Sequence, residues 1–250
     1  MGYFEKLWAD VVRVLFENAR WTWLTNGLKN TVIITLCAVL FGMALGFFLG
    51  IIRITHDKLA PDLQLRARKG GADFFGYIGL KFANAVAKMY LTIIRGTPVM
   101  VQLLIIYFVI FASVSVNKTF VAILAFGLNS AAYVAEIIRG GIMAVDNGQM
   151  EAGRSLGFSY PRTMLRIILP QAFKNVLPSL GNEVIVLLKE TSVASVIAVE
   201  DLTYGGTMIR SITYSAFLPL IAVALIYLVV VIGLTRLLTL LERRLRTSDH

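Results

Sequence analysis

Apolar residues fill several long stretches of the chain that contain no charged side chain. Such stretches cover residues 30–52, 96–117 and 211–235, and a shorter one covers residues 119–135. The hydrocarbon core of a bilayer is about 30 Å thick, and about 20 helical residues cross it. These stretches therefore predict membrane-spanning helices.

A fifth apolar region, residues 173–199, is interrupted by Glu183, Lys189 and Glu190. Membrane proteins hold such charges on faces that are buried in protein, so we count this region as a fifth span. The sequence thus predicts an all-α integral membrane protein with five transmembrane helices. The predicted helices cover about residues 30–53, 90–112, 119–140, 173–199 and 211–236.

The basic residues predict how these helices are oriented. Of the 24 Lys and Arg residues, 16 fall in segments 53–88 and 139–174 or after residue 235, and only six fall on the opposite side. Cytoplasmic loops carry the excess of Lys and Arg, so we expect the N-terminus outside and the C-terminus in the cytoplasm. In a chain with 57% hydrophobic residues, the net charge of +9 is explained by these basic cytoplasmic loops and does not indicate a nucleic-acid partner.

The first 27 residues predict an amphipathic helix that lies on the membrane surface. Phe4, Trp8, Val11 and Leu15 recur at helical spacing, and charged residues stand between them. The alternative is a helix packed on another subunit. The least apolar part of the chain, residues 56–88, is interpreted as a cytoplasmic linker with a short surface helix over residues 74–88.

Three glycines, Gly42, Gly46 and Gly50, form a small-residue stripe on the first predicted span. Helix packing explains this stripe without a ligand. The single cysteine, Cys37, and the two isolated histidines offer no metal site, and no nucleophile stands with a base. The sequence predicts no catalytic residue and no cofactor in this chain.

The segment over residues 141–172 is the most patterned of the predicted cytoplasmic loops. It contains the run EAGRSLGFSYPRTMLRIILPQA. Gly157 is suited to end one helix, and Ser159 and Pro161 are suited to begin another. Pro170 then marks a bend toward the membrane. A helix, a glycine turn and a second helix are predicted here.

This loop resembles the EAA loop of ABC importer permeases, whose pattern is E-A-A, three residues, Gly, nine residues and I-x-L-P. The third position holds glycine in place of alanine, a small-for-small change that costs some helix propensity but leaves docking possible. In that family the loop couples the permease to its ATPase subunit. The positions that carry this resemblance are Glu151, Ala152, Gly153, Gly157, Ile167, Leu169 and Pro170.

Further runs resemble the permeases that take up polar amino acids such as histidine, glutamine, arginine, glutamate and opines. These runs are YLTIIRGTPVMVQLLIIYF from Tyr90, AYVAEIIRGGI from Ala132 and GNEVIVLLKETSVASVI from Gly181. The resemblance implies a type I ABC importer permease domain over residues 28–246, in the inner membrane of a bacterium.

The same resemblance implies a set of partners. Two permeases pair in the membrane, ABC ATP-binding subunits dock on the EAA loops, and an extracytoplasmic binding protein delivers an amino acid substrate. The sequence contains no G-x-x-x-x-G-K-[ST] phosphate loop, so ATP and Mg²⁺ belong to the partner subunit. Whether the second permease is the same or a homologous chain stays open, as does the identity of the amino acid.

The charges of the fourth predicted helix are candidates for substrate binding. Glu183 and Glu190 are seven residues apart, which places them on one helix face about 10.5 Å apart along the axis. A carboxylate there suits the α-ammonium group of an amino acid. Alternatively, Lys189 or Arg95 neutralises a glutamate in an architectural pair. The complete candidate set is Glu183, Glu190, Asn182, Leu187 and Ser192.

Two alternatives to the amino acid permease stay open. A permease for another small polar solute has the same architecture. A stand-alone secondary transporter would use membrane carboxylates as ion sites, but the chain has no inverted repeat. Glu136 and Arg139, three residues apart, are expected to form a structural ion pair.

Overall fold

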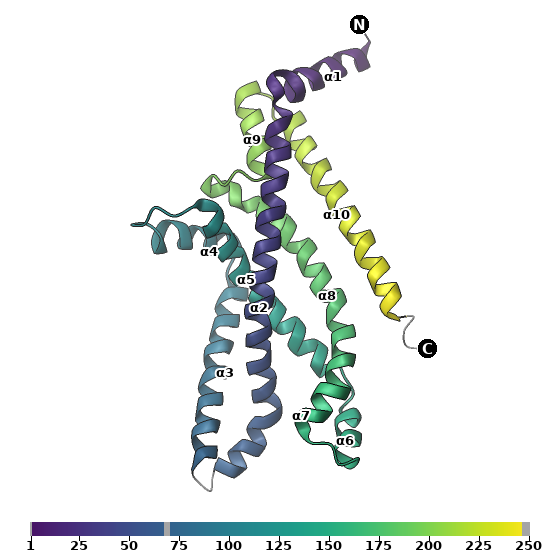
Figure 1. Ribbon diagram of the computed structural model, residues 1–250. Coiled ribbons are helices and arrows are strands. Elements are labelled where there is room, and N and C mark those ends of the chain that lie inside the picture. Colours follow the sequence, from purple (N-terminus) through teal and green to yellow (C-terminus); the bar gives the residue numbers. More distant parts are fainter. Residues whose placement is uncertain (1, 68–70, 247–250) are drawn as a thin grey trace. The chain divides into compact units, whose positions relative to one another are not determined.

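The computed structural model describes residues 2–67 and 71–246, and every regular element in these ranges is a helix (Figure 1). In chain order the elements are α1 (Tyr3–Val11), η1 (Val12–Phe16), η2 (Glu17–Ala19), α2 (Trp21–Ala67), α3 (Ala72–Gly96), α4 (Val99–Ile105), η3 (Ile106–Ile110), α5 (Lys118–Met143), α6 (Asn147–Ser155), α7 (Tyr160–Thr163), η4 (Met164–Ile168), α8 (Leu169–Glu190), η5 (Thr191–Ile197), α9 (Leu202–Thr213) and α10 (Phe217–Arg246).

Helices long and apolar enough to cross a membrane are present, as predicted. Trp21–Pro61 of α2, Lys118–Met143 of α5 and Phe217–Arg244 of α10 each qualify by length and composition. A fourth candidate is a broken pair, Asp73–Gly96 and Val99–Ile110, whose two parts differ in direction by 107°. The predicted class, an all-α membrane protein, is therefore confirmed. Within the described residues three helices, or four with the broken pair, meet these criteria in place of the five predicted, and α8 is not among them.

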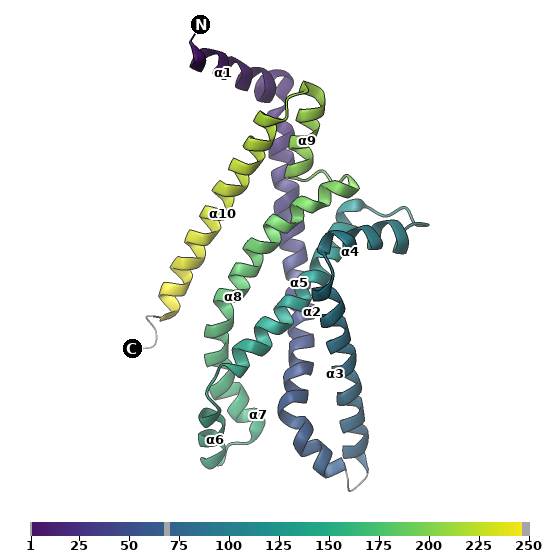
Figure 2. The ribbon, with the colours of Figure 1, turned by 180° about the vertical axis from the view of Figure 1, so that it is seen from behind.

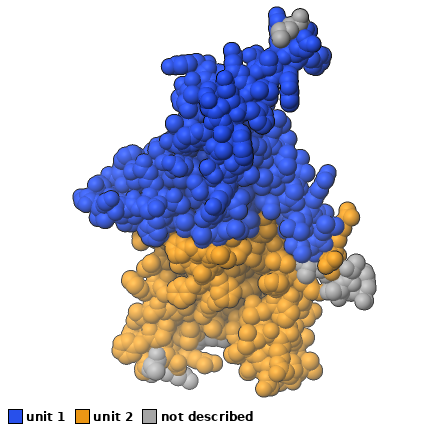
Figure 3. All heavy atoms as spheres, turned by 45° about the horizontal axis from the view of Figure 1, so that its top comes forward, with its two compact units in different colours: residues 1–38, 100–126, 184–241 blue, residues 39–99, 127–183, 242–250 orange. Residues whose placement is uncertain are grey.

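Contacts divide the chain into two compact units, which Figure 3 shows in two colours. Unit 1 comprises residues 1–38, 100–126 and 184–241, and unit 2 comprises residues 39–99, 127–183 and 242–250. Helices α2, α4, α5, α8 and α10 contribute residues to both units. Each unit has its own apolar core, and each is described by itself.

In unit 2, the glycine stripe of α2 packs directly on α5. A Cβ atom on Gly46 would lie 2.7 Å from Val134 Cβ, and one on Gly42 would lie 2.9 Å from Ser130 Cβ. Real Cβ atoms do not approach this closely, so the contact requires glycine. The predicted packing role of the stripe is confirmed.

The rest of the unit 2 core joins the same two helices to α8. Buried apolar residues from α2, α5 and the start of α8 form one cluster that includes Ile54, Ile138 and Val176. Helix α3 runs back beside the second half of α2 (Figures 1 and 2), and Arg53 Nη1 donates to Asn84 Oδ1 across this pair over 3.0 Å.

In unit 1, the start of α2 packs against α9. The amide of Leu202 donates to Thr31 Oγ1 over 3.1 Å, and Asn30 Nδ2 donates to the carbonyl oxygen of Glu200 over 2.8 Å. A Cβ atom on Gly205 would lie 2.5 Å from the carbonyl oxygen of Trp23. Close backbone contact therefore holds these two helices together.

The first span and the segment after it differ from the prediction. Helix α2 begins at Trp21 and continues to Ala67, well beyond the predicted limits of 30 and 53. The predicted helix over residues 74–88 is present as part of α3, whereas residues 56–67, predicted as linker, belong to α2. Residues 68–70 of the predicted loop lie outside the described residues. Hydropathy reports apolar surface and not helix formation, which explains the difference.

The predicted helix over residues 90–112 is broken. Helix α3 ends at Gly96, and Thr97 is extended, with φ −126° and ψ 146°. Pro98 explains the break because its ring disfavours helical geometry in the preceding residue and it has no amide hydrogen. Helix α4 therefore starts in a new direction at Val99.

The last two predicted spans also differ in their bounds. Helix α8 ends at Glu190 and continues as the 3₁₀ turn η5, which stops at Ala198 with φ 56°. A separate helix that was not predicted, α9, ends before Tyr214, with φ 54°, so α10 begins at Phe217 and not at residue 211.

At the N-terminus, the segment 1–27 is not one helix. Helix α1 ends at Val11, and positive φ angles of 53° at Asn18 and 55° at Ala19 separate it from α2. Phe4 is 82% exposed and Trp8 is 68% exposed. These apolar side chains suit a membrane surface, and the interfacial role stays a prediction.

Candidate functional site

The predicted helix, glycine turn and helix are present in the segment 141–172. Asp146 Oδ1 accepts a hydrogen bond from the amide of Gly148 over 2.6 Å and caps α6. Gly157 adopts φ +83°, the left-handed conformation that favours glycine and ends a helix. Helix α7 then starts at Tyr160, with Ser159 as its N-cap. Local capping and turn signals in the sequence thus produce this loop. Because it resembles the EAA loop, we call residues 141–172 the coupling loop and α6 the coupling helix; the role itself is a prediction.

Gly153 of the loop faces inward. A Cβ atom on it would lie 2.5 Å from Thr163 Cγ2, and Thr163 is completely buried. Glycine at this position therefore allows α6 to pack on α7. The sequence interpretation treated it as a small residue for docking, whereas the structure places it between two helices of the loop.

The outer surface of the loop contains both predicted and unpredicted residues. Glu151 and Ala152 are exposed on α6, and Pro170 is exposed at the start of α8, whereas Ile167 and Leu169 are partly buried. The sequence analysis missed one exposed apolar residue. Leu156, directly before the glycine turn, is 76% exposed, and an apolar residue at such a turn could have been chosen from the sequence.

Ion pairs connect the helices of unit 2 close to the coupling loop. Arg139 Nε lies 3.2 Å from Glu136 Oε2, which confirms the predicted pair. Arg139 Nη1 also lies 3.5 Å from Asp57 Oδ2, and Arg95 Nη1 lies 3.8 Å from Glu136 Oε1. These contacts join α2, α3 and α5. Asp57 was not predicted because residues 56–88 were interpreted as a linker.

A second link reaches the coupling helix itself. Lys58 Nζ donates to Asn147 Oδ1 over 3.0 Å. Asn147 is the first residue of α6, so the end of α2 is attached to the start of the coupling helix. The two residues are far apart in sequence, and no spacing rule predicts their contact.

Among the candidate substrate residues of unit 2, Glu183 has a defined polar partner. Its Oε1 accepts a hydrogen bond from Ser130 Oγ over 2.9 Å, and the side chain is partly buried. Asn182 is exposed. Ser130 is completely buried on α5 and was not predicted as part of the site. The arrangement orients a carboxylate on a partly exposed helix face.

The remaining candidates lie in unit 1. Leu187 is completely buried, which places it in the core and not on the open face expected between Glu183 and Glu190. Glu190 is partly buried. Ser192 lines a pocket of about 360 Å³ together with Lys189 and Tyr227. The candidate set is thus distributed between core, pocket and partly exposed positions.

Unit 1 also holds a buried carboxyl that the sequence analysis missed. Asp201 is completely buried, and its Oδ1 accepts from the amide of Tyr204 over 2.8 Å as the N-cap of α9. Within the described residues its Oδ2 has no hydrogen-bond partner. Burial raises the pKa of Asp201 to about 6, although hydrogen bonds from Tyr204 and Thr203 oppose this shift. An Asp before a helical run is a recognisable N-cap signal.

Comparison with known proteins identifies the class. Residues 74–247 match the family described as binding-protein-dependent transport system inner membrane component. The chain therefore belongs to this family. It is a membrane component of a transport system and not itself an ATPase, and a stand-alone transporter is disfavoured.

Individual relatives match nearly the whole chain. The arginine transport system permease protein ArtQ of Bacillus subtilis (strain 168) is 36% identical over 90% of this chain and 94% of its own length. The glutamine transport system permease protein GlnP of Escherichia coli (strain K12) is 34% identical over 89% of this chain and 93% of its own.

Solved structures agree with these relatives. The crystal structure of an amino acid ABC transporter with histidines matches with a TM-score of 0.76 and 40% identity, over 89% of this chain and 94% of that one. A structure of the MetNI methionine ABC transporter matches with a TM-score of 0.70 at 16% identity, over 92% of this chain and 99% of that one, which shows a shared fold.

Proposed function

We propose that this chain is the permease subunit of an ATP-driven ABC importer that moves a polar L-amino acid across the inner membrane of a bacterium. The observation that carries the proposal is the coupling loop, a capped helix attached to α2 through Lys58 and Asn147. The named substrates of the similar permeases, arginine and glutamine, support a polar amino acid.

The coupling loop is the contact surface for a separate ATP-binding subunit in this proposal. Glu151, Ala152 and Leu156 are exposed and form the docking surface. Gly153 and Gly157 shape the loop behind it, and Ile167, Leu169 and Pro170 continue it into α8. Force applied to α6 during ATP binding then passes to α2 and α8, because the loop is continuous with α8 and bonded to α2.

ATP and Mg²⁺ bind to the partner subunit, and this chain supplies the membrane path. The sequence has no phosphate-binding loop of its own. A second permease, identical or homologous, completes the path, and an extracytoplasmic binding protein delivers the substrate. The C-terminus faces the cytoplasm and the N-terminus faces outside in this arrangement, as the distribution of basic residues favours.

Glu183 is the first residue that we assign to the substrate. Its carboxylate is oriented by Ser130 over 2.9 Å, and it suits the α-ammonium group that all amino acids carry. Asn182, Glu190 and Ser192 are secondary candidates. Ionisable residues in membrane helices are functional candidates because leaving them in lipid is costly.

Reconstitution of the complete transporter tests the proposal. The permease is purified together with an ATP-binding subunit and a binding protein of the same transport system, and uptake of arginine, glutamine and histidine into proteoliposomes is measured with and without ATP. ATP-dependent uptake of at least one of these amino acids is the expected result. Uptake without ATP, or of none of them, would contradict the proposal.

The Glu183→Gln variant tests the substrate assignment in the same assay. Loss of a charge-assisted hydrogen bond costs about 1.5–3 kcal/mol, which weakens substrate binding to the permease by roughly 10- to 150-fold. Affinity of the separate binding protein and basal ATPase activity stay unchanged. Glu242→Gln, which removes the charge of a glutamate in α10, is the matched control. Wild-type uptake by Glu183→Gln at every substrate concentration would show that Glu183 has a structural role and does not bind the substrate.

A further inference from the structure

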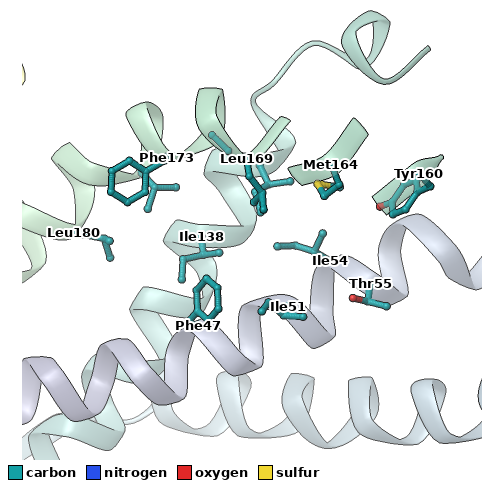
Figure 4. A pocket seen from close by; sticks show the side chains of 13 residues that line it. Phe47, Ile51, Ile54, Thr55, Ile138, Tyr160, Met164, Leu169, Phe173 and Leu180 are labelled. Atoms are coloured by element: carbon teal, nitrogen blue, oxygen red, sulfur yellow. The ribbon is translucent and has the colours of Figure 1, made fainter. Parts of the chain in front are cut away.

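An apolar groove runs along one side of unit 2. Helices α2, α5 and α8 line it, and its volume is about 450 Å³. Figure 4 shows Phe47, Ile51 and Ile54 of α2 along one wall, with Leu169 and Phe173 of α8 opposite. From Phe47 to Thr55 the helix rises by about 12 Å, so the groove is elongated.

The groove lies at the end of two membrane spans. Its α2 residues fall in the last part of the span Trp21–Pro61, and Ile138 and Ile142 fall in the last part of the span Lys118–Met143. Several lining side chains are open at its mouth: Phe47 is 55% exposed and Phe173 is 58% exposed. Apolar surface of this extent is covered by lipid or protein at membrane depth.

One end of the groove is polar. Thr55 and Tyr160 close it at the end away from Leu180, as Figure 4 shows. Tyr160 belongs to the coupling loop, outside the spans, and burial raises the pKa of its hydroxyl. The hydroxyl therefore stays protonated and able to donate a hydrogen bond. The groove is thus apolar along most of its length and has a hydrogen-bond donor, the Tyr160 hydroxyl, at one end.

A second pocket shares Tyr160 with this polar end and adds positive charge. Tyr160 also lines this pocket of about 330 Å³, whose other walls include Arg66 and Arg154. The nearby carboxylate of Asp57 is already engaged, 3.5 Å from Arg139. The two pockets that share Tyr160 therefore combine an apolar slot with two arginines, the complement of a chain that ends in an anion.

We propose that unit 2 binds an anionic phospholipid here, with an acyl chain in the groove and the phosphate between Tyr160, Arg66 and Arg154. Arginine presents its donors in a fork that matches phosphate oxygens. The lipid then connects the end of α2 to the coupling loop. The site rests on the membrane fold of the chain and is independent of the transported substrate.

Photochemical labelling in vesicles tests the site. The full-length chain is reconstituted in phosphatidylcholine vesicles that contain a few per cent of phosphatidylglycerol with a diazirine in its acyl chain, and adducts are mapped by mass spectrometry. Adducts are expected on α2 near Ile51 and on α8 near Phe173, above those at Val229, a 69% exposed residue of α10. Unlabelled phosphatidylglycerol is expected to compete better than phosphatidylcholine.

Two pairs of variants separate the acyl slot from the headgroup pocket. Ile51→Trp fills the groove and abolishes these adducts, whereas Leu40→Trp on an exposed part of the same helix leaves them unchanged. Arg66→Gln and Arg154→Gln each reduce the preference for phosphatidylglycerol by about fivefold, as expected for one basic residue at a lipid surface. Arg236→Gln, an exposed arginine of α10, is the control.

Three outcomes would overturn the proposal. Equal labelling of the groove and of Val229 would show ordinary bulk lipid. Equal competition by phosphatidylcholine would show that the site does not recognise an anionic headgroup. Disulfide formation between two copies of an Ile51→Cys variant in these vesicles, without lipid adducts in the groove, would make the groove a contact between permeases. Each outcome is independent of whether amino acid uptake succeeds.

Discussion

Lys58 Nζ donates a hydrogen bond to Asn147 Oδ1 over 3.0 Å, and this contact attaches the end of α2 to the first residue of the coupling helix α6. Both residues are exposed to solvent in part, so the bond stabilises the attachment by only about 0.5–1 kcal/mol. The bond is important for coupling because of its location, although its contribution to stability is small. It joins a helix long and apolar enough to span the membrane to the helix that we propose meets the ATPase.

Removing this contact should weaken coupling. We expect Lys58→Met and Asn147→Leu each to lower substrate-stimulated ATP hydrolysis by about two- to fivefold, and the double variant to add little. Basal hydrolysis is the reference. Lys88→Met, which changes an exposed lysine of α3, controls for lost charge. Fully additive effects of the two substitutions would show that the two side chains act independently.

The interior of the coupling loop gives a prediction about stability. Gly153→Ala places a Cβ atom 2.5 Å from Thr163 Cγ2, so α6 and α7 must separate. Such overpacking costs about 1–3 kcal/mol. Thr163→Ser removes the Cγ2 atom and keeps the hydroxyl that donates to the carbonyl oxygen of Ser159. The thermal midpoint of the complex should fall in Gly153→Ala and recover in the double variant. Equal stability of Gly153→Ala and wild type would contradict this packing.

The coupling loop could be predicted from sequence because its signals are local. Gly157 ends α6 and Ser159 begins α7 within a few residues of each other. Membrane spans were also found, because long apolar runs are local as well. Their bounds were less accurate: Pro98 breaks an apolar run that hydropathy treats as continuous, and the polar end of α2 stays helical up to Ala67.

Contacts between distant residues could not be predicted in this way. Ser130 and Glu183 are 53 positions apart, and their hydrogen bond depends on how α5 and α8 pack. Leu187 shares a helix with Glu183, yet it is completely buried, since one helix carries both a core face and a polar face. Helical spacing alone does not tell which neighbours cover which face.

The turn after α6 gives a second prediction for the coupling loop. Gly157 has φ +83°, where an L-residue costs about 1–2 kcal/mol and a β-branched residue costs more. Gly157→Val should therefore distort the turn and abolish substrate-stimulated ATP hydrolysis and uptake, while the chain still inserts in the membrane. Gly140→Val, at a position with open space, is the control for added volume. Normal coupled activity of Gly157→Val would count against the assignment of this loop.

The proposed orientation is tested by labelling from outside. In a Cys37→Ser background, single cysteines replace Arg66, Gln149 and Trp8, which are all exposed. An impermeant maleimide applied to intact spheroplasts should label the cysteine at position 8 only. The other two should react after the membrane is permeabilised. Labelling of position 149 in intact spheroplasts would reverse the topology.

Asp201 makes the stability of unit 1 depend on pH. Burial raises its pKa from 3.8 to about 6, so the folded state favours the protonated carboxyl. The contribution of the protonated Asp201 to the free energy of unfolding is complete below about pH 4. It is lost as the pH rises from about 4 to 6 and is absent at higher pH. The loss is on the order of 3 kcal/mol at most.

Thermal unfolding of wild type should therefore show a decline over this window that Asp201→Asn lacks, because asparagine caps α9 without a charge. Glu200→Gln, at the adjacent exposed carboxylate, should keep the wild-type profile. Identical pH profiles for wild type and Asp201→Asn would show that burial does not raise the pKa of Asp201.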